Sequence, residues 1–478
     1  MVTTVPAVVI AAPASGSGKT TVATGLIGAL RRAGHAVAPF KVGPDFIDPG
    51  YHALAAGRPG RNLDPVMVGE NLIGPLYGHG TRGADIAVVE GVMGLFDGRI
   101  VDHPTIPAQG STAQVAALLG APVVLVVDGR GQGQSLAALV HGFATFGATG
   151  GGVGPRIAGV ILNRVGSARH ELVLRQACEQ AGVAVLGAIP RAAELDVPSR
   201  YLGLITTAEY GRRAREAVDA MTALVATHVD IAAVAACASA AVRSPAWDPA
   251  VDIEKATSVG SDNAGGRGVS PTVAVAAGRA FTFGYTEHGE LLRAAGAQVV
   301  DFDPLCDPLP EGTDAVLLPG GFPEQFTAEL AANDLVRAQI RDLAASGGPI
   351  HAECAGLIYL VSELDDAPMC GVLAGSARFT ERLTLGYRDS VALTDSSVYR
   401  AGQRLVGHEF HRTAVTFTTD YPSAWASREH GAEGVVAQGV HASYLHTHPA
   451  AAPESVARFV ACAARRGRSP GANTTLAR

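Results

Sequence analysis

The sequence predicts an α/β protein with two tandem domains, each built around a largely parallel sheet. Short runs rich in β-branched residues alternate with helical segments in both halves, which is typical of a parallel sheet covered by helices. A stretch of linker-like composition separates the halves. At 478 residues, the chain is also too long for one ordinary core.

The first domain is expected over residues 1–226. Its strands are predicted at apolar runs that precede loops and helical segments: Val5–Ala12, Ala36–Phe40, Asp85–Glu90, Pro122–Asp128, Ile157–Asn163 and Val183–Ile189. Strands joined by helices pair in parallel, so their carboxyl ends should meet at one edge of the sheet.

The alternation fails over residues 227–271, which we interpret as a linker. Ala-rich text there gives way to Ser-Pro and then to the loop-forming run Ser261–Gly266. A second α/β series occupies residues 272–466, with strands predicted at Val273–Ala277, Gln298–Phe302, Ala315–Leu318 and Pro349–Ala352. The tail, residues 467–478, carries no pattern and is predicted to be disordered.

Composition excludes several classes of function. With 47% hydrophobic and 17% charged residues the chain should be globular, and its net charge of -7 leaves no basic stripe for nucleic acid. The six cysteines show neither close pairs nor metal-type spacing, so a reducing compartment is expected. No apolar run reaches the ~18 residues that cross a bilayer, and no basic residue precedes the apolar start. We therefore expect a cytoplasmic protein with no membrane partner.

A phosphate-binding loop follows the first predicted strand and precedes a helix. Its glycines let backbone N–H groups surround phosphate oxygens, Lys19 can reach the terminal phosphates, and Thr20 can ligate Mg²⁺. Pro13 stands where the first glycine of the usual motif would be, which points to a sub-branch of this motif. The predicted ATP-binding residues here are Ser15, Gly16, Ser17, Gly18, Lys19, Thr20 and Thr21.

Carboxylates lie near the ends of the neighbouring predicted strands, where α/β sheets place their ligands. Glu90 ends one strand, and a Gly-Pro turn after the second strand carries one lysine and two aspartates. The predicted metal ligands are Thr20, Asp45 and Glu90. The predicted contacts to substrate or phosphate are Lys41, Asp48 and Asp97. Any single aspartate of these could instead merely cap a turn.

The second domain carries a candidate nucleophile. The text Gly348–Leu357 indicates a buried strand that runs into a sharp turn and a helix, which would expose Cys354 at the sheet edge. The other five cysteines are interpreted as inert. The strand-end turn Leu318–Glu324 offers further N–H groups, and the predicted oxyanion donors are Gly320, Gly321 and Ala355.

A base for this nucleophile is predicted near the C-terminus. His446 and His448 follow a predicted strand, and on a strand they would share a face. In isolation both could be surface residues. Beside a cysteine elbow and a Gly-Gly turn, we favour catalysis.

Together these motifs resemble the cobyrinate or hydrogenobyrinate a,c-diamide synthase family over residues 5–465. The segments that look like its dethiobiotin-synthetase-type ATP domain are Ser15–Thr21, Lys41–Pro49 and Glu90–Gly98. Those that look like its class I-type glutaminase domain are Pro319–Glu324, Glu353–Leu357, Gly407–His411 and Ala442–His448. Ala355 stands where glycine is usual and Phe322 where tyrosine is common, which should leave the backbone donors in place.

The resemblance implies two linked reactions on the route to vitamin B12. Cys354, activated by His446, would release ammonia from L-glutamine, and ATP with Mg²⁺ would activate the c and then the a carboxylate of a corrinoid. His448 or another group would orient His446, since no Glu follows at the usual spacing. Asn163 matches the family's adenine-binding asparagine. We prefer a substrate-facing or structural role over metal binding for His408, Glu409 and His411.

Three other kinds of protein share parts of this sequence pattern. Cobyric acid synthase and nickel-sirohydrochlorin a,c-diamide synthase are related enzymes; the Lys-Val-Gly-Pro-Asp and His-Thr-His texts favour the diamide synthase over the former. A ParA-like ATPase would share the phosphate loop, but the second domain argues against it. The sequence leaves open whether the corrinoid carries cobalt, how ammonia passes between domains, and the oligomeric state, with a homodimer as one option.

Overall fold

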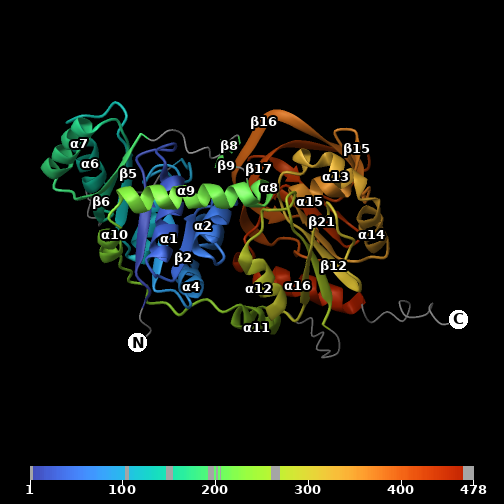
Figure 1. Cartoon of the computed structure of the whole chain (residues 1–478). Helices are drawn as coiled ribbons and strands as arrows, with labels where there is room; N and C mark the ends of the chain where they lie inside the picture. The colour runs from blue at the N-terminus through green and yellow to red at the C-terminus, as the bar shows by residue number, and fades with distance from the viewer. Residues whose placement is uncertain are drawn as a thin grey trace. The chain divides into compact units, whose positions relative to one another are not determined.

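The computed structural model of the chain describes residues 4–102, 107–146, 154–191, 199–200, 203–204, 206–259 and 270–466. It divides into two compact units, Met1–Trp247 and Asp248–Arg478, shown in Figure 1. The division falls inside the segment 227–271 that the sequence predicts as a linker. The predicted loop Ser261–Gly266 and the predicted disordered tail, residues 467–478, lie outside the described residues.

The first unit is built on a seven-stranded parallel sheet with the order β3-β2-β4-β1-β5-β6-β7. Its strands are β1 (Ala7–Ala11), β2 (Val37–Val42), β3 (Arg61–Leu63), β4 (Ile86–Glu90), β5 (Val123–Asp128), β6 (Ile157–Val165) and β7 (Val185–Pro190). All six predicted strands are present to within a few residues. The short β3 was missed because three residues carry no readable period. With β1 between β4 and β5, the loops after β1, β2 and β4 lie together.

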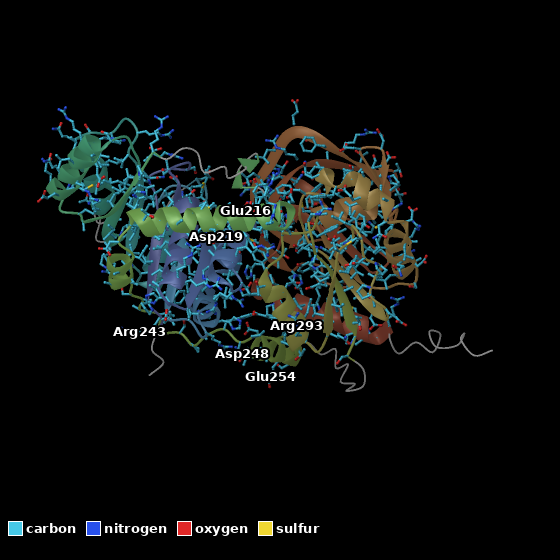
Figure 2. The ribbon with its side chains drawn as sticks, viewed as in Figure 1. Glu216, Asp219, Arg243, Asp248, Glu254 and Arg293 are labelled. Carbon is cyan, nitrogen blue, oxygen red and sulfur yellow. The ribbon has the colours of Figure 1, made fainter. Side chains whose placement is uncertain are left out.

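Helices cover the first sheet. They are α1 (Lys19–Arg32), α2 (Asp48–Ala56), α3 (Pro65–Val68), α4 (Glu70–Gly80), α5 (Thr112–Leu119), α6 (Leu136–Thr145), α7 (Ala168–Gln180), α8 (Thr207–Tyr210), α9 (Arg212–His228) and α10 (Ile231–Cys237). A two-stranded ribbon adds β8 (Ser199–Arg200) and β9 (Gly203–Leu204). The long helix α9 packs against α1 (Figure 1). Glu216 and Asp219 lie on the exposed side of α9 (Figure 2), where Asp219 pairs with Arg32 of α1 at 2.6 Å.

The segment predicted as a linker is partly helical. It contains the end of α9, the whole of α10, and α11 (Pro249–Val259). Asp230 caps α10, because its Oδ1 accepts a hydrogen bond of 2.9 Å from the N–H of Ala233. The Ala-rich text that breaks the strand and helix alternation is itself favourable for helix formation, which explains the difference from the prediction.

The second unit has a six-stranded sheet with the order β11-β10-β12-β13-β21-β20. Its strands are β10 (Thr272–Ala276), β11 (Gln298–Phe302), β12 (Thr313–Leu318), β13 (Ile350–Glu353), β20 (Val435–Ala437) and β21 (Val440–Ser443). All neighbours pair in parallel except β20 with β21. The four strands predicted in this half are present. Because β12, β13 and β21 are adjacent and parallel, the turns that follow them meet at one edge.

The remaining helices of the second unit are α12 (Thr286–Ala294), η1 (Pro323–Gln325), α13 (Thr327–Ala332), α14 (Asp334–Ala345), α15 (Ala355–Leu360), η2 (Pro449–Ala451) and α16 (Pro453–Arg466). Aliphatic side chains from these helices and from the sheet form a buried core around Val316, Ile340 and Leu357. Burial of this apolar surface is the main term that stabilises the unit.

A second sheet in this unit was not predicted. Its strands are β14 (Val361–Leu364), β15 (Ala367–Pro368), β16 (Leu373–Ala392), β17 (Arg404–Phe417), β18 (Trp425–Ser427) and β19 (Gly431–Glu433). The long antiparallel pair β16–β17 breaks register between Phe379 and Thr384. Much of β16 is only half buried, so its sequence lacks the apolar run or strict alternation on which strand prediction depends.

No helix among the described residues is both long enough and apolar enough to span a membrane. All six cysteines are free thiols.

Candidate functional site

The loop predicted to bind phosphate joins β1 to α1. Gly18 is the N-cap residue of α1, with φ of 93°. Within the loop, the Ser17 hydroxyl donates a hydrogen bond of 2.8 Å to the carbonyl of Ala14. Ser15 and Gly16 are exposed, whereas Lys19 is buried and its Nζ donates 2.5 Å to the carbonyl of Met93. Burial and the nearby Lys41 lower the pKa of Lys19. The exposed part of the loop therefore faces solvent at the N-terminus of a 14-residue helix, where anions are favoured.

Asn163 lies against this loop. Its Nδ2 donates 2.9 Å to the carbonyl of Ser17, and a Cβ at Gly18 would lie 2.3 Å from that nitrogen. The loop is also held by Arg164, which the sequence analysis missed: its Nη1 donates 2.8 Å to the carbonyl of Gly16 and 2.6 Å to Asp128 Oδ2. The position of Asp128 at the end of a predicted strand was the available signal.

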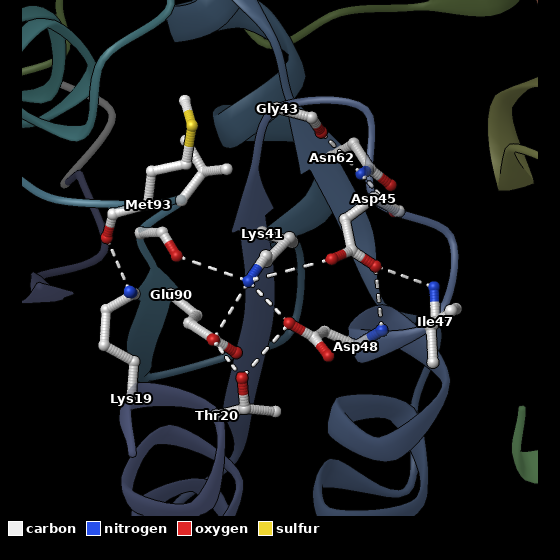
Figure 3. Close-up of polar contacts among 12 residues, drawn as sticks. Lys19, Thr20, Lys41, Gly43, Asp45, Ile47, Asp48, Asn62, Glu90 and Met93 are labelled. Carbon is white, nitrogen blue, oxygen red and sulfur yellow. Dashed lines mark hydrogen bonds and ion pairs between the residues drawn. The ribbon is translucent and has the colours of Figure 1, made fainter. Parts of the chain in front are cut away.

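A cluster of four side chains lies beside the loop (Figure 3), at the ends of β2 and β4. Lys41 Nζ donates 2.6 Å to Asp48 Oδ2 and 2.9 Å to Glu90 Oε1. The Thr20 hydroxyl lies 2.7 Å from Glu90 Oε1 and 3.2 Å from Asp48 Oδ2. The structure thus brings together four of the predicted site residues from four different segments of the chain.

The charges in this cluster depend on one another. Burial alone would lower the pKa of Lys41, but Asp48 and Glu90 raise it above its usual value. Burial would raise the pKa of Glu90, but Lys41 and then His52 lower it, and His52 Nε2 lies 2.6 Å from Glu90 Oε2. Burial and Asp45 raise the pKa of Asp48 to about 7. Lys41 and Glu90 are therefore a charged pair, with Asp48 as the group in the cluster that titrates near neutrality.

Asp45 and Asp97 have local roles in the structure. Asp45 Oδ1 accepts hydrogen bonds from the N–H groups of Ile47 and Asp48 at 2.7 and 3.0 Å, and its Oδ2 lies 4.0 Å from Lys41 Nζ. Asp97 Oδ2 accepts 2.8 Å from the N–H of Gly94. Asp48, predicted as a substrate contact, lies nearer to Thr20 than the predicted metal ligand Asp45 does, as Figure 3 shows.

The oxygen atoms of Thr20, Asp48 and Glu90 suit Mg²⁺. This ion prefers hard oxygen ligands and usually takes one or two carboxylates together with phosphate oxygens and water. Within the described ranges, no group of three or more His, Cys, Asp or Glu side chains has the arrangement of a complete metal site. A site completed by the phosphates of a nucleotide is compatible with both observations.

In the second unit, Cys354 occupies a sharp turn between β13 and α15. Its φ of 49° and ψ of -100° are rare for a residue with a side chain. The Cys354 N–H donates 2.7 Å to the carbonyl of Ser443 at the end of β21, and its Sγ lies 3.8 Å from the carbonyl of Phe410. Strained backbone held by neighbouring strands is the geometry of a nucleophile elbow.

Two of the three predicted oxyanion donors face the sulfur. Burial and Glu324 raise the pKa of the Cys354 thiol, while hydrogen bonds from the N–H groups of Ala355 and Gly321 oppose that rise. Gly320 has a different role, because a Cβ there would lie 2.2 Å from His446 Cε1. The Gly-Gly turn therefore contacts both residues, Cys354 through the N–H of Gly321 and His446 through Gly320.

The two predicted histidines follow a strand, as expected: β21 ends at Ser443, and His446 then forms an isolated antiparallel bridge with His408. His446 is fully buried, exchanges two backbone hydrogen bonds of 2.9 Å with His408, and has its pKa lowered to about 3 by burial, His408 and His411. His448 points elsewhere: its Nδ1 accepts 3.3 Å from the N–H of Ala450, and its ring lies 4.3 Å from that of Tyr285.

The segment Gly407–His411 lines the same region from β17. Glu409 forms a buried ion pair with Arg388, with Nη2 and Oε2 2.7 Å apart. His411 stacks on Tyr444 with ring centres 3.7 Å apart. These contacts fit the second of the two roles preferred from the sequence, which were a substrate-facing role and a structural role.

Comparison with known proteins identifies both halves. Residues 8–204 match the family described as CobQ/CobB/MinD/ParA nucleotide binding domain, and residues 272–453 match the CobB/CobQ-like glutamine amidotransferase domain. A hydrogenobyrinate a,c-diamide synthase of Mycobacterium tuberculosis (strain ATCC 25618 / H37Rv) is 70% identical over 96% of this chain and 98% of its own length. That of Streptomyces coelicolor is 53% identical over 95% and 97%. A cobyrinate a,c-diamide synthase of Synechococcus sp. is 36% identical, with the same coverage of 95% and 97%.

Proposed function

Because this chain belongs to the hydrogenobyrinate/cobyrinate a,c-diamide synthase family, we propose that it uses ATP and glutamine to amidate the a and c carboxylates of hydrogenobyrinate in cobalamin biosynthesis. The observation that carries this proposal is that one chain holds two arrangements: a cysteine elbow with backbone donors, and a phosphate loop beside a carboxylate cluster. The substrate without cobalt is favoured because the relatives at 70% and 53% identity both carry its name.

The glutaminase half begins with Cys354. Sγ attacks the amide carbon of glutamine while its proton passes to Nε2 of His446, and the N–H groups of Gly321 and Ala355 stabilise the oxyanion. The imidazolium then gives its proton to the leaving ammonia. Water, deprotonated by His446, hydrolyses the thioester to release glutamate and restore the thiol.

The ATP half prepares a carboxylate for ammonia. The phosphate loop and Lys19 bind the nucleotide phosphates, and the carboxylate displaces ADP from the γ-phosphoryl group to give an acyl phosphate. Ammonia then attacks the acyl carbon, loses a proton, and expels phosphate to leave the amide. Mg²⁺, held by Thr20, Glu90 and Asp48, would neutralise charge on the phosphates. Lys41 donates hydrogen bonds to both carboxylates and so orients them, and its charge lowers the pKa of Glu90.

The test is an amidation assay read by mass spectrometry. Hydrogenobyrinate and cobyrinate are each incubated with ATP, Mg²⁺ and glutamine. Each amidation replaces a carboxyl hydroxyl group by an amino group, so two amidations appear as two successive losses of about one mass unit. We expect both on hydrogenobyrinate, faster than on cobyrinate. Mass unchanged on both substrates, with active glutaminase, would overturn the proposal.

A further inference from the structure

Glu353 occupies a place that the reaction described above does not use. It is the last residue of β13, directly before Cys354, and it is 6% exposed. Burial of a charged carboxylate costs free energy unless hydrogen bonds or an opposite charge stabilise it, so the position of Glu353 calls for an explanation. Burial raises the pKa of Glu353 to about 7, which hydrogen bonds from Thr447 only partly oppose.

The carboxylate lies between the two chain segments that carry the catalytic groups. Its Oε1 accepts hydrogen bonds from Thr447, at 2.7 Å from the hydroxyl and 3.1 Å from the N–H. Its Oε2 lies 3.9 Å from Nδ1 of His446. One oxygen is thus fixed by the residue that follows His446, while the other faces the imidazole.

We propose that Glu353 is the positioning residue of the glutaminase: it orients His446 through Nδ1 and stabilises the imidazolium formed when Nε2 takes the Cys354 proton. This rests on the proposed glutaminase function. The separation of 3.9 Å is longer than a hydrogen bond, and such pairs are often looser before substrate binds. The orienting carboxylate therefore comes from the residue before the nucleophile, while position 448, two after His446, holds a histidine.

His448 is the competing candidate from the sequence. Its Nδ1 caps η2 by accepting from Ala450, and its ring packs on Tyr285 and influences the pKa of His288. These contacts lead away from Cys354. Glu353, by contrast, is joined to the loop of His446 by two hydrogen bonds, and its Oε2 lies 3.9 Å from Nδ1 of that imidazole.

Other titratable groups surround the pair. His351 on β13 has its Nε2 3.6 Å from Glu353 Oε1, and the Tyr399 hydroxyl donates 2.9 Å to Thr447 Oγ1, whose own proton goes to Glu353. On the other side of His446 lies His408 of β17. Burial lowers the pKa of both His351 and His408, so Glu353 is the acidic group of the set that titrates near neutrality.

The experiment compares Glu353→Gln with His448→Asn in the full chain. Gln keeps an oxygen that accepts from Thr447 but removes the charge, and Asn keeps an acceptor for the N–H of Ala450. We expect E353Q to lower glutaminase kcat by ~10²-fold, the low end for a general-base system, with little change in KM for glutamine. In the wild type, glutaminase kcat should rise as pH increases through about 7, where Glu353 ionises. This rising limb of the pH profile should be lost in E353Q. H448N should stay within a few-fold of wild type.

Three controls keep the outcomes distinct. Ammonia-driven amidation by E353Q should match wild type, which shows that the protein is folded. Glu353→Asp, which restores charge, should recover part of kcat. Thr447→Val, which removes one donor to Oε1, gives a second route if E353Q fails to fold, and should lower kcat with a shifted pH limb.

A wild-type pH limb retained in E353Q and in T447V, or a large loss of kcat confined to H448N, would overturn the role of Glu353. Absence of glutamine hydrolysis by the wild type would instead overturn the proposed function.

Discussion

The two candidate sites handle charge in opposite ways. In the first unit, Lys41, Asp48 and Glu90 are in direct contact, and the cluster holds its ions by pairing them. In the second unit, burial raises the pKa of Cys354 and lowers that of His446, so both rest as neutral groups. The first site holds its charges before any ligand arrives, and its carboxylate oxygens suit a cation such as Mg²⁺. The second creates its charges only during the reaction, stabilised by backbone N–H groups.

Removing the nucleophile should separate the two sites most sharply. Cys354→Ala removes the sulfur that forms the thioester, so glutamine hydrolysis should fall below detection while amidation with added ammonium persists at wild-type rate. Steady-state assays with each nitrogen source measure this. Loss of the ammonium-driven reaction would show that amidation in the first unit depends on Cys354 in the second.

The reverse separation should follow from Lys41→Met. It leaves two buried carboxylates without their cation, which typically costs about 3–5 kcal/mol. In addition to that loss of stability, amidation with ammonium should fall by ~10²-fold, since Lys41 orients the carboxylates that would hold Mg²⁺. Glutaminase activity should be retained. Thermal unfolding and both assays test this, and Lys255→Met on the exposed surface is a matched control.

A smaller effect is expected at the turn that joins Cys354 and His446. In Gly320→Ala the added Cβ would lie 2.2 Å from His446 Cε1, so the imidazole must move. A displacement of about 1 Å can cost on the order of 10²-fold in rate. Glutaminase kcat should fall accordingly, with ammonium-driven amidation unchanged. Gly347→Ala, where a Cβ meets nothing within 4 Å, controls for substitution in the same unit, although its φ of 77° adds strain. Equal activity of wild type and G320A would break the proposed geometry.

The smallest effect concerns stability against pH. The pKa of Glu353 is raised in the folded protein from the usual 4.5 to about 7, so its contribution to stability is full below about pH 4.5 and is lost as pH rises to about 7. Across that window wild type should lose up to about 1.4 kcal/mol per pH unit relative to E353Q. Melting of the second unit, followed from pH 4.5 to 7.5, measures the slope. The pKa of Glu433 is also raised to about 7, but Glu433 is present in both proteins, so its contribution cancels in the difference between their stabilities. Parallel melting curves would contradict the raised pKa.

Sequence reasoning found what local patterns encode. The strands that precede Thr20, Glu90 and Cys354 were predicted because buried parallel strands are continuous apolar runs. Which side chains contact one another could not be predicted from the sequence in the same way. That Asp48 rather than Asp45 lies against Thr20 depends on how α2 begins, where one oxygen of Asp45 is used by two backbone N–H groups.

The long hairpin and Glu353 show the same limit. The pair β16–β17 is half exposed and its register is broken, so no periodic signal marks it. Glu353 directly precedes the predicted nucleophile in the sequence. His446, whose Nδ1 lies 3.9 Å from its carboxylate, is 93 positions further along the chain. Only tertiary structure brings them together.

The burial of Cys354 also bears on how long the enzyme survives oxidative conditions. Peroxide and alkylating reagents attack thiolates that solvent can reach. The pKa of both the Cys354 and the Cys306 thiol is raised, but Cys354 is 1% exposed whereas Cys306 is exposed. A nucleophile that becomes a thiolate only as it attacks glutamine is protected from such damage between turnovers, and surface cysteines are modified first.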